Sequence, residues 1–363
     1  MRILRLYVLA EHATPFFVTL GGLTAMLLIG NIIKFADLVI SKGVSPFDIL
    51  RLLIYLLPYM LSFTIPMACL IAVVLAFGRL SSDHELIAMR ASGVAPLRLV
   101  GPMLLVGLVI SVGLLVVNDR LSPEAHLAFR QQLKAIGIKQ PTAYIEAGMF
   151  IKDFPPYVMF VYQVDGRRLD NVRIYEPQSA GPTRTIVASR GEFEPGANPR
   201  ELTLKLYDGT VDEWDPNTPG AFYKVNFHTY AIILRPDQQD TGRLRKKLKE
   251  MAWKEMVAER HRLHAEGIDA LPVSLELHRR IASSFSALIF LAFGLAMGLR
   301  FHHHERLTSF LWVLGMFFVY YLSSIAMYPL AIKGATPPWL MMWAPNLLGG
   351  LVSGWMMVRA VRH

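Results

Sequence analysis

The sequence predicts an α-helical polytopic membrane protein with an inserted all-β domain, and three observations support this fold class. The chain of 363 residues is 53% hydrophobic, with a positive mean hydropathy. Its apolar residues form several runs longer than the roughly 18 to 20 residues that a helix needs to cross a bilayer. A long polar stretch separates the third run from the fourth. The chain therefore has a membrane part and an external part.

We expect six transmembrane helices in a 3+3 arrangement. They cover residues 13–35, 51–78, 97–118, 278–299, 307–331 and 338–358. The corresponding domain division is 1–119 for helices 1–3, 120–275 for the external domain and its connector, and 276–363 for helices 4–6. The first span is longer than the apolar region of a cleaved signal, and no small-x-small site follows it. We interpret it as a retained anchor.

The net charge of +9 belongs mainly to the membrane part. Residues 120–275 hold 22 Lys+Arg and 20 Asp+Glu, which leaves 15 basic and 8 acidic residues elsewhere. Basic residues near membrane spans are orientation signals, so the charge does not indicate nucleic-acid binding. A cytoplasmic N-terminus places nine arginines on that side: Arg2, Arg5, Arg79, Arg90, Arg98, Arg300, Arg306, Arg359 and Arg362. Six cations are expected outside: Lys34, Lys42, Arg51, Arg279, Arg280 and Lys333.

The external domain has the composition of β structure. Runs rich in β-branched and aromatic residues predict strands within 142–154, 157–166, 171–177, 185–194, 201–214 and 222–234. Asp165-Gly166 and Asp208-Gly209 are typical of tight turns. Leu202, Leu204 and Leu206 alternate with polar or aromatic residues, as in a strand with one buried face. Six strands in so short a stretch favour a sandwich or jelly roll.

A helical connector is expected at about 243–266. One side of it carries apolar residues: Leu244, Leu248, Met251 and Met256. Its basic first half is compatible with binding of lipid phosphates. Glutamates at 250, 255 and 259 offset the basic residues, so we favour a solvated helix face.

A charged segment, GRLSSDHELIAMRASGVAP, lies between the second and third spans. Ser82 and Glu85 fit a capping box, Gly93 suits the left-handed end of a helix, and Pro96 prevents continuation. We therefore predict a short cytoplasmic helix at about 83–92. Its apolar residues point to nearly every side, which favours docking in a protein groove over lying on lipid.

ELIAMRASG in this position, GNIIKFADL at the end of the first span and ELHRRIASSFSALIF at the start of the fourth resemble the LptF/LptG family of lipopolysaccharide export permeases. The 3+3 frame around an external β domain is also similar, so the resemblance covers essentially the whole chain. GNIIKFADL resembles one subunit type, whereas ELHRR and the VDG turn resemble the other.

The resemblance implies a permease subunit of an ABC transporter in the inner membrane of a Gram-negative bacterium. Both termini would be cytoplasmic and the jelly-roll domain periplasmic. The implied partners are a dimeric cytoplasmic ATPase, a second LptF/LptG-type subunit, usually in a heterodimer, and a periplasmic jelly-roll bridge. The implied substrate is lipopolysaccharide, taken from the outer leaflet.

The resemblance also implies roles for individual residues. Glu85 matches the acidic residue that contacts the ATPase, within a coupling signature that also includes Leu86, Met89, Arg90, Ser92 and Gly93. Lys34 matches a basic residue that faces the headgroup phosphates in one subunit type. We add Arg51, Arg279 and Arg280 as headgroup candidates, because these cations lie on the side where few are expected. Interfacial anchoring or snorkelling is the alternative for all four.

The sequence offers no catalytic chemistry. It contains no GxxxxGK[ST] and no G-x-S-x-G, so we expect a non-enzymatic subunit, with ATP and Mg²⁺ used by the partner and no cofactor bound directly. Cys69 is the only cysteine and lies within a span, so the external domain cannot form an internal disulfide. The His302-His303-His304-Glu305 run is interpreted as a cytoplasmic turn and not a metal site. Gly294-x-x-x-Gly298 and Gly350-x-x-x-Gly354 are interpreted as packing sites.

Two other functions stay open at this point. A non-transporting membrane scaffold could bind a periplasmic partner through its β domain, but it would leave the cytoplasmic helix without a role. An ABC permease for a different lipid, or for a periplasmic signalling function, is a third and less favoured alternative.

Overall fold

The computed structural model describes residues 2–40, 43–93, 97–139, 148–154, 156–165, 168–177, 183–195, 202–214, 222–234, 246–300, 306–333 and 337–362. The chain forms two compact units. The first unit comprises residues 1–30, 55–127 and 246–363, and the second comprises 31–54 and 128–245. The predicted three-part domain division stays a prediction.

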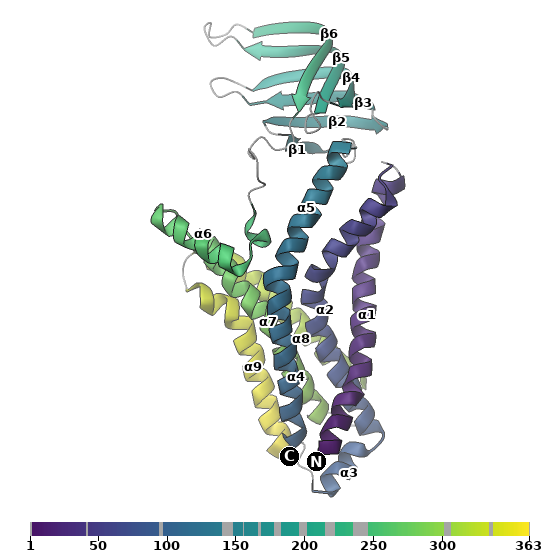
Figure 1. The fold of residues 1–363 in the computed structure, drawn as a ribbon, viewed down its shortest axis with the longest axis vertical. Coiled ribbons are helices and arrows are strands. Elements are labelled where there is room, and N and C mark those ends of the chain that lie inside the picture. Colours follow the sequence, from purple (N-terminus) through teal and green to yellow (C-terminus); the bar gives the residue numbers. More distant parts are fainter. Residues whose placement is uncertain are drawn as a thin grey trace. The chain divides into compact units, whose positions relative to one another are not determined.

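Helices account for most of the described residues (Figure 1). In chain order they are α1 (Arg2–Ile40), α2 (Pro46–Ser82), α3 (Glu85–Ala91), α4 (Leu97–Val116), α5 (Ser122–Lys139), α6 (Trp253–Ala265), α7 (Leu271–Arg300), α8 (Arg306–Ile332) and α9 (Pro338–Arg362). A π-helix, η1 (Val117–Leu121), joins α4 to α5, and a short 3₁₀ helix, η3 (Leu248–Glu250), precedes α6.

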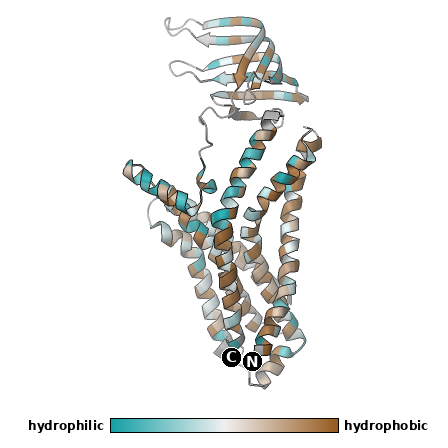
Figure 2. Ribbon diagram, viewed as in Figure 1, coloured by the Kyte–Doolittle hydropathy of each residue, from teal (hydrophilic) through white to brown (hydrophobic). Residues whose placement is uncertain are grey.

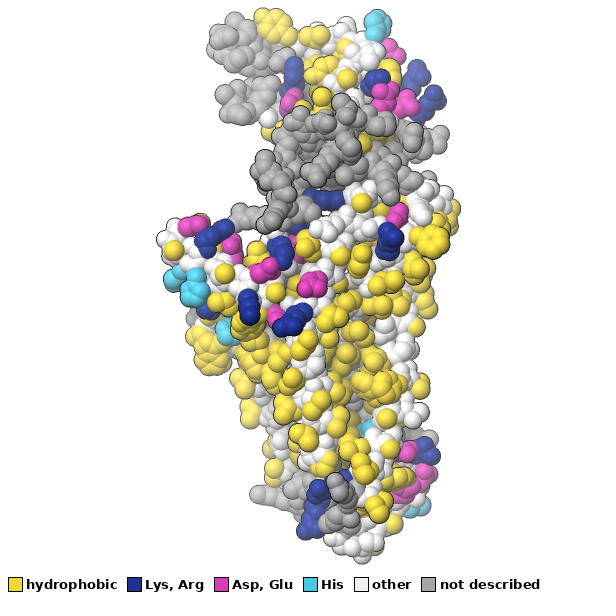
Figure 3. All heavy atoms as spheres, in the orientation of Figure 1, with side chains coloured by type: hydrophobic (Ala, Val, Ile, Leu, Met, Phe, Trp, Pro, Cys, Tyr) yellow, Lys and Arg dark blue, Asp and Glu magenta, His cyan; other side chains and the backbone are white. Residues whose placement is uncertain are grey.

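Five helical segments in the described part of the chain are long and apolar enough to cross a membrane. They are Ile3–Ile40, Pro46–Ser82, Val100–Ile136, Leu271–Leu299 and Leu311–Ile332. Figure 2 shows the hydrophobic residues along these helices, and Figure 3 shows hydrophobic side chains covering much of their outer surface. The sixth predicted span coincides with α9, which is helical but is not among the five. Six spans therefore stay a prediction.

Helix α7 forms the centre of the first unit and packs against α2, α4 and α9. A Cβ atom on Gly298 would lie 2.6 Å from Cβ of Phe77, and one on Gly294 would lie 3.2 Å from the Leu70 carbonyl oxygen. These two glycines allow α7 to approach α2 closely, which confirms the packing interpretation for the first glycine pair. In the second pair, Gly350 faces Ile289 at an ordinary distance of 3.6 Å.

The connector before α7 is only partly helical. Leu248, Met251 and Met256 pack against Val273 and Leu277 of α7, which confirms the predicted apolar side for these three residues. Most other α6 side chains are exposed or half-buried, and Lys246 bonds to Glu255 across the start of the helix. That hydrogen bond lowers the pKa of the Glu255 carboxyl. These features agree with a solvated helix face.

The described part of the second unit contains a six-stranded antiparallel sheet. Its strands, β1 (Phe150–Phe154), β2 (Tyr157–Asp165), β3 (Arg168–Glu176), β4 (Arg184–Pro195), β5 (Leu202–Trp214) and β6 (Phe222–Leu234), lie side by side in chain order (Figure 1). Each strand pairs with its sequence neighbour, so the described strands form a meander. The predicted β domain is present, whereas its jelly-roll topology is not confirmed.

The predicted alternation along β5 is confirmed. Leu202, Leu204 and Leu206 are buried in the apolar core of the sheet, whereas the residues between them are half-buried. Side chains alternate between the faces of a strand, so one face of the sheet collects the apolar residues.

The turn predicted at Asp208-Gly209 is wrong, because both residues lie within β5. Pairing continues from Tyr207↔Thr229 to Gly209↔Phe227 without a reversal of the chain. A Cβ on Gly209 would lie 2.3 Å from the Val187 carbonyl oxygen and 2.5 Å from the Phe227 ring. The glycine is therefore required by close packing. Asp208 has a positive φ of 50°, which aspartate tolerates better than most residues.

The second unit also contains the end of α1, the start of α2 and most of α5. These segments share a small apolar cluster, to which Phe35, Leu52 and Ile136 each contribute from a different helix. Gln132 Nε2 donates a 2.8 Å hydrogen bond to Asp48 Oδ1 beside this cluster. Apolar packing and one polar contact therefore hold the three helix ends together.

Several predicted features lie outside the described residues. They are residues 142–147 of the first predicted strand, Gly166, Pro96, Leu244 and the run His302-His303-His304-Glu305.

We expect Gly209→Ala to destabilise the sheet by about 1–3 kcal/mol, because the added methyl group meets backbone and ring atoms that cannot move away easily. The measurement is thermal unfolding of the full-length protein in detergent, followed by near-ultraviolet circular dichroism. Gly191→Ala is the matched control, since its nearest neighbours are side-chain methyl groups at 3.3 Å. An equal loss of thermal stability in the two variants would contradict the packing explanation.

Candidate functional site

Helix α3 lies in a sharp connection between α2 and α4. His84 has a φ of 57° and precedes the helix, and Gly93 has a φ of 75° and follows it. The left-handed glycine at the helix end confirms that part of the prediction. The helix spans Glu85–Ala91, slightly shorter than expected.

The predicted capping box is wrong. Helix α2 continues through Ser82, and the next amide, of Asp83, still donates to the Arg79 carbonyl oxygen at 2.9 Å. Glu85 is consequently the first residue of α3, whereas a capping box requires the glutamate at the third helical position. Because α2 extends further than the apolar run, Ser82 belongs to the preceding helix.

Glu85 bonds instead to α1. Tyr7 Oη lies 2.9 Å from each carboxylate oxygen of Glu85 and donates to this carboxylate. Nearby, Arg79 pairs with Glu11 at 2.7 Å and lies 3.7 Å from Asp83. The Tyr7–Glu85 contact fixes α3 against the start of α1, and the Arg79–Glu11 pair joins the end of α2 to the same part of α1. No pattern in the sequence points to Tyr7.

The two apolar residues assigned to docking lie on the inner side of α3. Leu86 and Met89 pack against the buried cluster that contains Val8 and Leu80. The outer side presents Ile87, which is 56% exposed, together with exposed Ala88 and Ala91. Leu86 and Met89 therefore position the helix, and the exposed apolar face is available for a partner.

The remaining members of the coupling signature, Arg90, Ser92 and Gly93, lie at the C-terminal end of α3. Ser92 Oγ donates to the Ala88 carbonyl oxygen at 2.9 Å and is exposed, as is Gly93. The side chain of Arg90 lies outside the described part of the structure.

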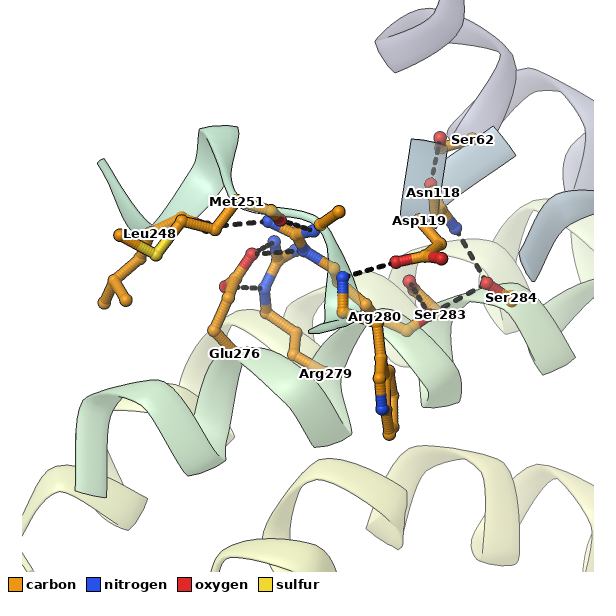
Figure 4. A network of polar contacts seen from close by, with 12 residues as sticks. Ser62, Asn118, Asp119, Leu248, Met251, Glu276, Arg279, Arg280, Ser283 and Ser284 are labelled. Atoms are coloured by element: carbon orange, nitrogen blue, oxygen red, sulfur yellow. Dashed lines mark hydrogen bonds and ion pairs between the residues drawn. The ribbon is translucent and has the colours of Figure 1, made fainter. Parts of the chain in front are cut away.

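Arg279 and Arg280 converge on one carboxylate (Figure 4). Arg279 donates to both oxygens of Glu276, at 2.8 and 2.7 Å, and Arg280 Nε donates to one of them at 3.1 Å. The Glu276 side chain is 6% exposed. A buried carboxylate is stabilised only when charges and hydrogen bonds satisfy it, and the two guanidinium groups do so here.

Arg280 also holds the connector. Its Nη1 donates to the Met251 carbonyl oxygen at 2.7 Å, and its Nη2 donates to that of Leu248 at 2.8 Å. The Arg280 side chain is 9% exposed, whereas that of Arg279 is 40% exposed. Arg280 therefore clamps the backbone of the connector, and Arg279 alone of the two retains substantial access to solvent.

A second polar group surrounds the π-helix (Figure 4). Asn118 accepts from Ser62 Oγ of α2 and donates to Ser284 Oγ of α7 at 2.8 Å. Asp119 Oδ1 accepts from the Trp253 amide at the start of α6, at 2.6 Å. Residues 118 and 119 thus join the connector to three membrane helices. A π-helix at a polar cluster is a frequent mark of a functional position, but sequence reasoning did not single these residues out.

Lys34 and Arg51 belong to the second unit and are exposed. Neither side chain has a hydrogen-bond or ion-pair partner among the residues that the structure describes. Both cations are therefore accessible to an anionic ligand. Among the described residues, no group of three or more His, Cys, Asp or Glu side chains could hold a metal ion.

A sequence model described as "Lipopolysaccharide export system permease LptF/LptG" matches residues 6–359. An uncharacterized protein of Rickettsia prowazekii is 22% identical to this chain over 313 residues, which cover 85% of each protein. The similarity extends over both compact units.

We expect Arg280→Met to weaken the connector and to cost about 2–4 kcal/mol, because it leaves the carbonyl groups of Leu248 and Met251 without this donor and removes one of the two guanidinium groups that satisfy buried Glu276. The measurement is the rate of limited tryptic cleavage near Lys246, Lys247 and Lys249 in the full-length protein. Arg280→Lys should also be cleaved faster than wild type, because lysine lacks the guanidinium fork. Arg262→Met, which removes an exposed arginine of α6, should leave the rate unchanged.

Proposed function

The chain belongs to the LptF/LptG family of lipopolysaccharide export system permeases, and on this premise we propose that it is the transmembrane permease subunit of an ABC transporter. The transporter extracts lipopolysaccharide from the outer leaflet of the inner membrane and passes it to a periplasmic bridge. The family match over residues 6–359 is the observation that carries this proposal. The apolar helices and the β sheet are consistent with it.

The energy for extraction comes from a separate dimeric ATPase in the cytoplasm. Transfer of acyl chains out of a bilayer costs about 0.8 kcal/mol for each CH₂ group. The sequence has no P-loop to supply that energy. Helix α3 is the proposed contact with the ATPase, through Glu85 and the exposed face at Ile87. Movement of α3 is transmitted to α1 and α2 by the Tyr7 and Arg79 contacts.

The substrate is held by its headgroup phosphates in this proposal. Lys34 and Arg51 are accessible to a phosphate. The exposed part of the Arg279 guanidinium group can also bind a phosphate while its hydrogen bonds to Glu276 stay formed. Arg280 acts indirectly by fixing Glu276 and the connector. A second LptF/LptG-type subunit pairs with this chain, and the lipid enters between the first span of one subunit and the fifth of the other.

The sheet provides the exit route. Its apolar face is formed by alternate residues of successive strands and is suited to shielding acyl chains from water. The lipid leaves along this face toward a bridge protein built from similar domains.

We expect Glu85→Arg to abolish association with the ATPase while membrane insertion stays normal, because the charge on the docking helix is reversed. Ile87→Glu should weaken association as well, since it places a charge on the exposed apolar face. The measurement is co-purification of the ATPase from native membranes in mild detergent. Glu266→Arg reverses a charge beyond α6 and should retain the ATPase. Normal association of the Glu85 variant would contradict the coupling role.

We expect a photo-crosslinking amino acid in place of Leu204 to form adducts with lipopolysaccharide in energised membranes. The same substitution at Lys205, the next residue of β5, should give few adducts because that side chain lies on the other face. Equal labelling, or none at either position, would contradict a conduit and would favour a scaffold that binds a periplasmic protein.

A further inference from the structure

A groove of about 1080 Å³ lies between α1 and α4 in the first unit, near the start of both helices. Its walls come from three residues of α1 and four of α4. They are Arg5, Leu6, Leu9, Arg98, Gly101, Pro102 and Leu105. The groove is thus a mainly apolar surface with two arginines and no acidic residue in its lining.

The two arginines are available for a ligand. Arg5 and Arg98 are exposed, and neither has a hydrogen-bond or ion-pair partner within the described ranges of the chain. Arg79, in the same unit, differs because Glu11 and Asp83 neutralise it. The groove therefore has an uncompensated positive charge.

The apolar walls are equally open. Leu6 and Leu105 are each 62% exposed, and a Cβ on Gly101 would meet nothing within 4 Å. The candidate spans begin at Ile3 and Val100, so the groove lies where two membrane-spanning helices start and lipid headgroups are found. A ligand at this place meets charge at one end and hydrocarbon along its length.

We propose that the groove binds an acidic phospholipid, with its phosphate between Arg5 and Arg98 and an acyl chain along Leu6, Leu9 and Leu105. Guanidinium groups bind phosphate in a bidentate manner, and basic pockets between membrane helices suit anionic headgroups. A soluble anion would use the arginines but not the leucines. A zwitterionic phospholipid offers the same phosphate, but its cationic ammonium group cancels that charge and leaves the net charge of the two arginines uncompensated. The proposal does not depend on the transport function.

In the orientation that the basic residues predict, this lipid belongs to the cytoplasmic leaflet. It therefore differs from the proposed cargo, which enters from the opposite leaflet. Tyr7 follows Leu6 directly and holds Glu85 of α3. The bound lipid would consequently lie beside the contact that anchors α3.

The test is native mass spectrometry of the purified full-length protein after incubation with phosphatidylglycerol or phosphatidylcholine in detergent. Wild type should retain phosphatidylglycerol in preference to phosphatidylcholine. Arg5→Gln combined with Arg98→Gln should reduce the retained phosphatidylglycerol by about tenfold, because two charge-assisted contacts are lost. Arg262→Gln combined with Arg359→Gln removes the same amount of charge outside the groove, and this variant should retain as much phosphatidylglycerol as wild type.

A second pair of variants tests the groove without changing its charge. Gly101→Leu fills the groove and should reduce phosphatidylglycerol retention, whereas Gly113→Leu, also on α4 with open space around it, should not. The normal thermal midpoint of each variant shows that it is folded. Equal retention of the two lipids by wild type would overturn the proposal, as would unchanged retention in both groove variants. Crosslinking of Arg98 to an acidic protein segment, with phosphatidylglycerol retention unaffected, would also overturn it.

Discussion

The carboxylate of Glu276 is almost fully buried on a membrane-spanning helix, and the organisation of the first unit depends on how that charge is satisfied. Arg279 and Arg280 both bond to it, and Arg280 uses its other nitrogens to hold two backbone carbonyl groups of the connector. A buried ion pair contributes little net stability compared with apolar packing, yet loss of one partner is costly. The cluster therefore specifies one arrangement of the connector against α7. Asn118 and Asp119 extend it to α2 and α6.

A small number of contacts also determines the position in which α3 meets a partner. One side of this short helix is buried on the first unit, and its first residue bonds to Tyr7. The proposed ATPase contact must therefore share the Glu85 carboxylate with Tyr7 or displace the tyrosine. An isolated seven-residue helix would be unstable in water, so these tertiary contacts are what keep it formed. A docking element that is already folded costs less conformational entropy when its partner binds.

The basic residues at the ends of the spans fall into two groups. Arg79, Arg279 and Arg280 are paired with carboxylates and have structural roles. Lys34, Arg51, Arg5 and Arg98 have no such partner among the described residues and are exposed. We assign all four cations of the second group to anionic lipids, and no described carboxylate competes with the lipid for them. Arg279 differs because it must keep Glu276 while it meets a phosphate. By sequence alone, Lys34, Arg51, Arg279 and Arg280 are alike candidates for the lipid headgroup, and Arg5, Arg79 and Arg98 count alike as orientation signals. Only their partners in the structure distinguish them.

The sequence by itself determined the features that depend on local patterns. Apolar length predicted the membrane helices, two-residue alternation predicted the buried face of β5, and β6 spans the expected residues 222–234. Gly93 was identified as a left-handed helix end because few other residues adopt that conformation. The tertiary structure decided the features that depend on distant neighbours. Gly209 lies in a strand because β5 pairs with β4 and β6 on both sides of it, and it must be glycine because Phe227 and Val187 crowd it. Glu85 begins a helix and binds Tyr7, and Arg280 clamps a connector about 30 residues away in sequence. A pattern within a few residues cannot specify such partners, because they come together only when the chain folds.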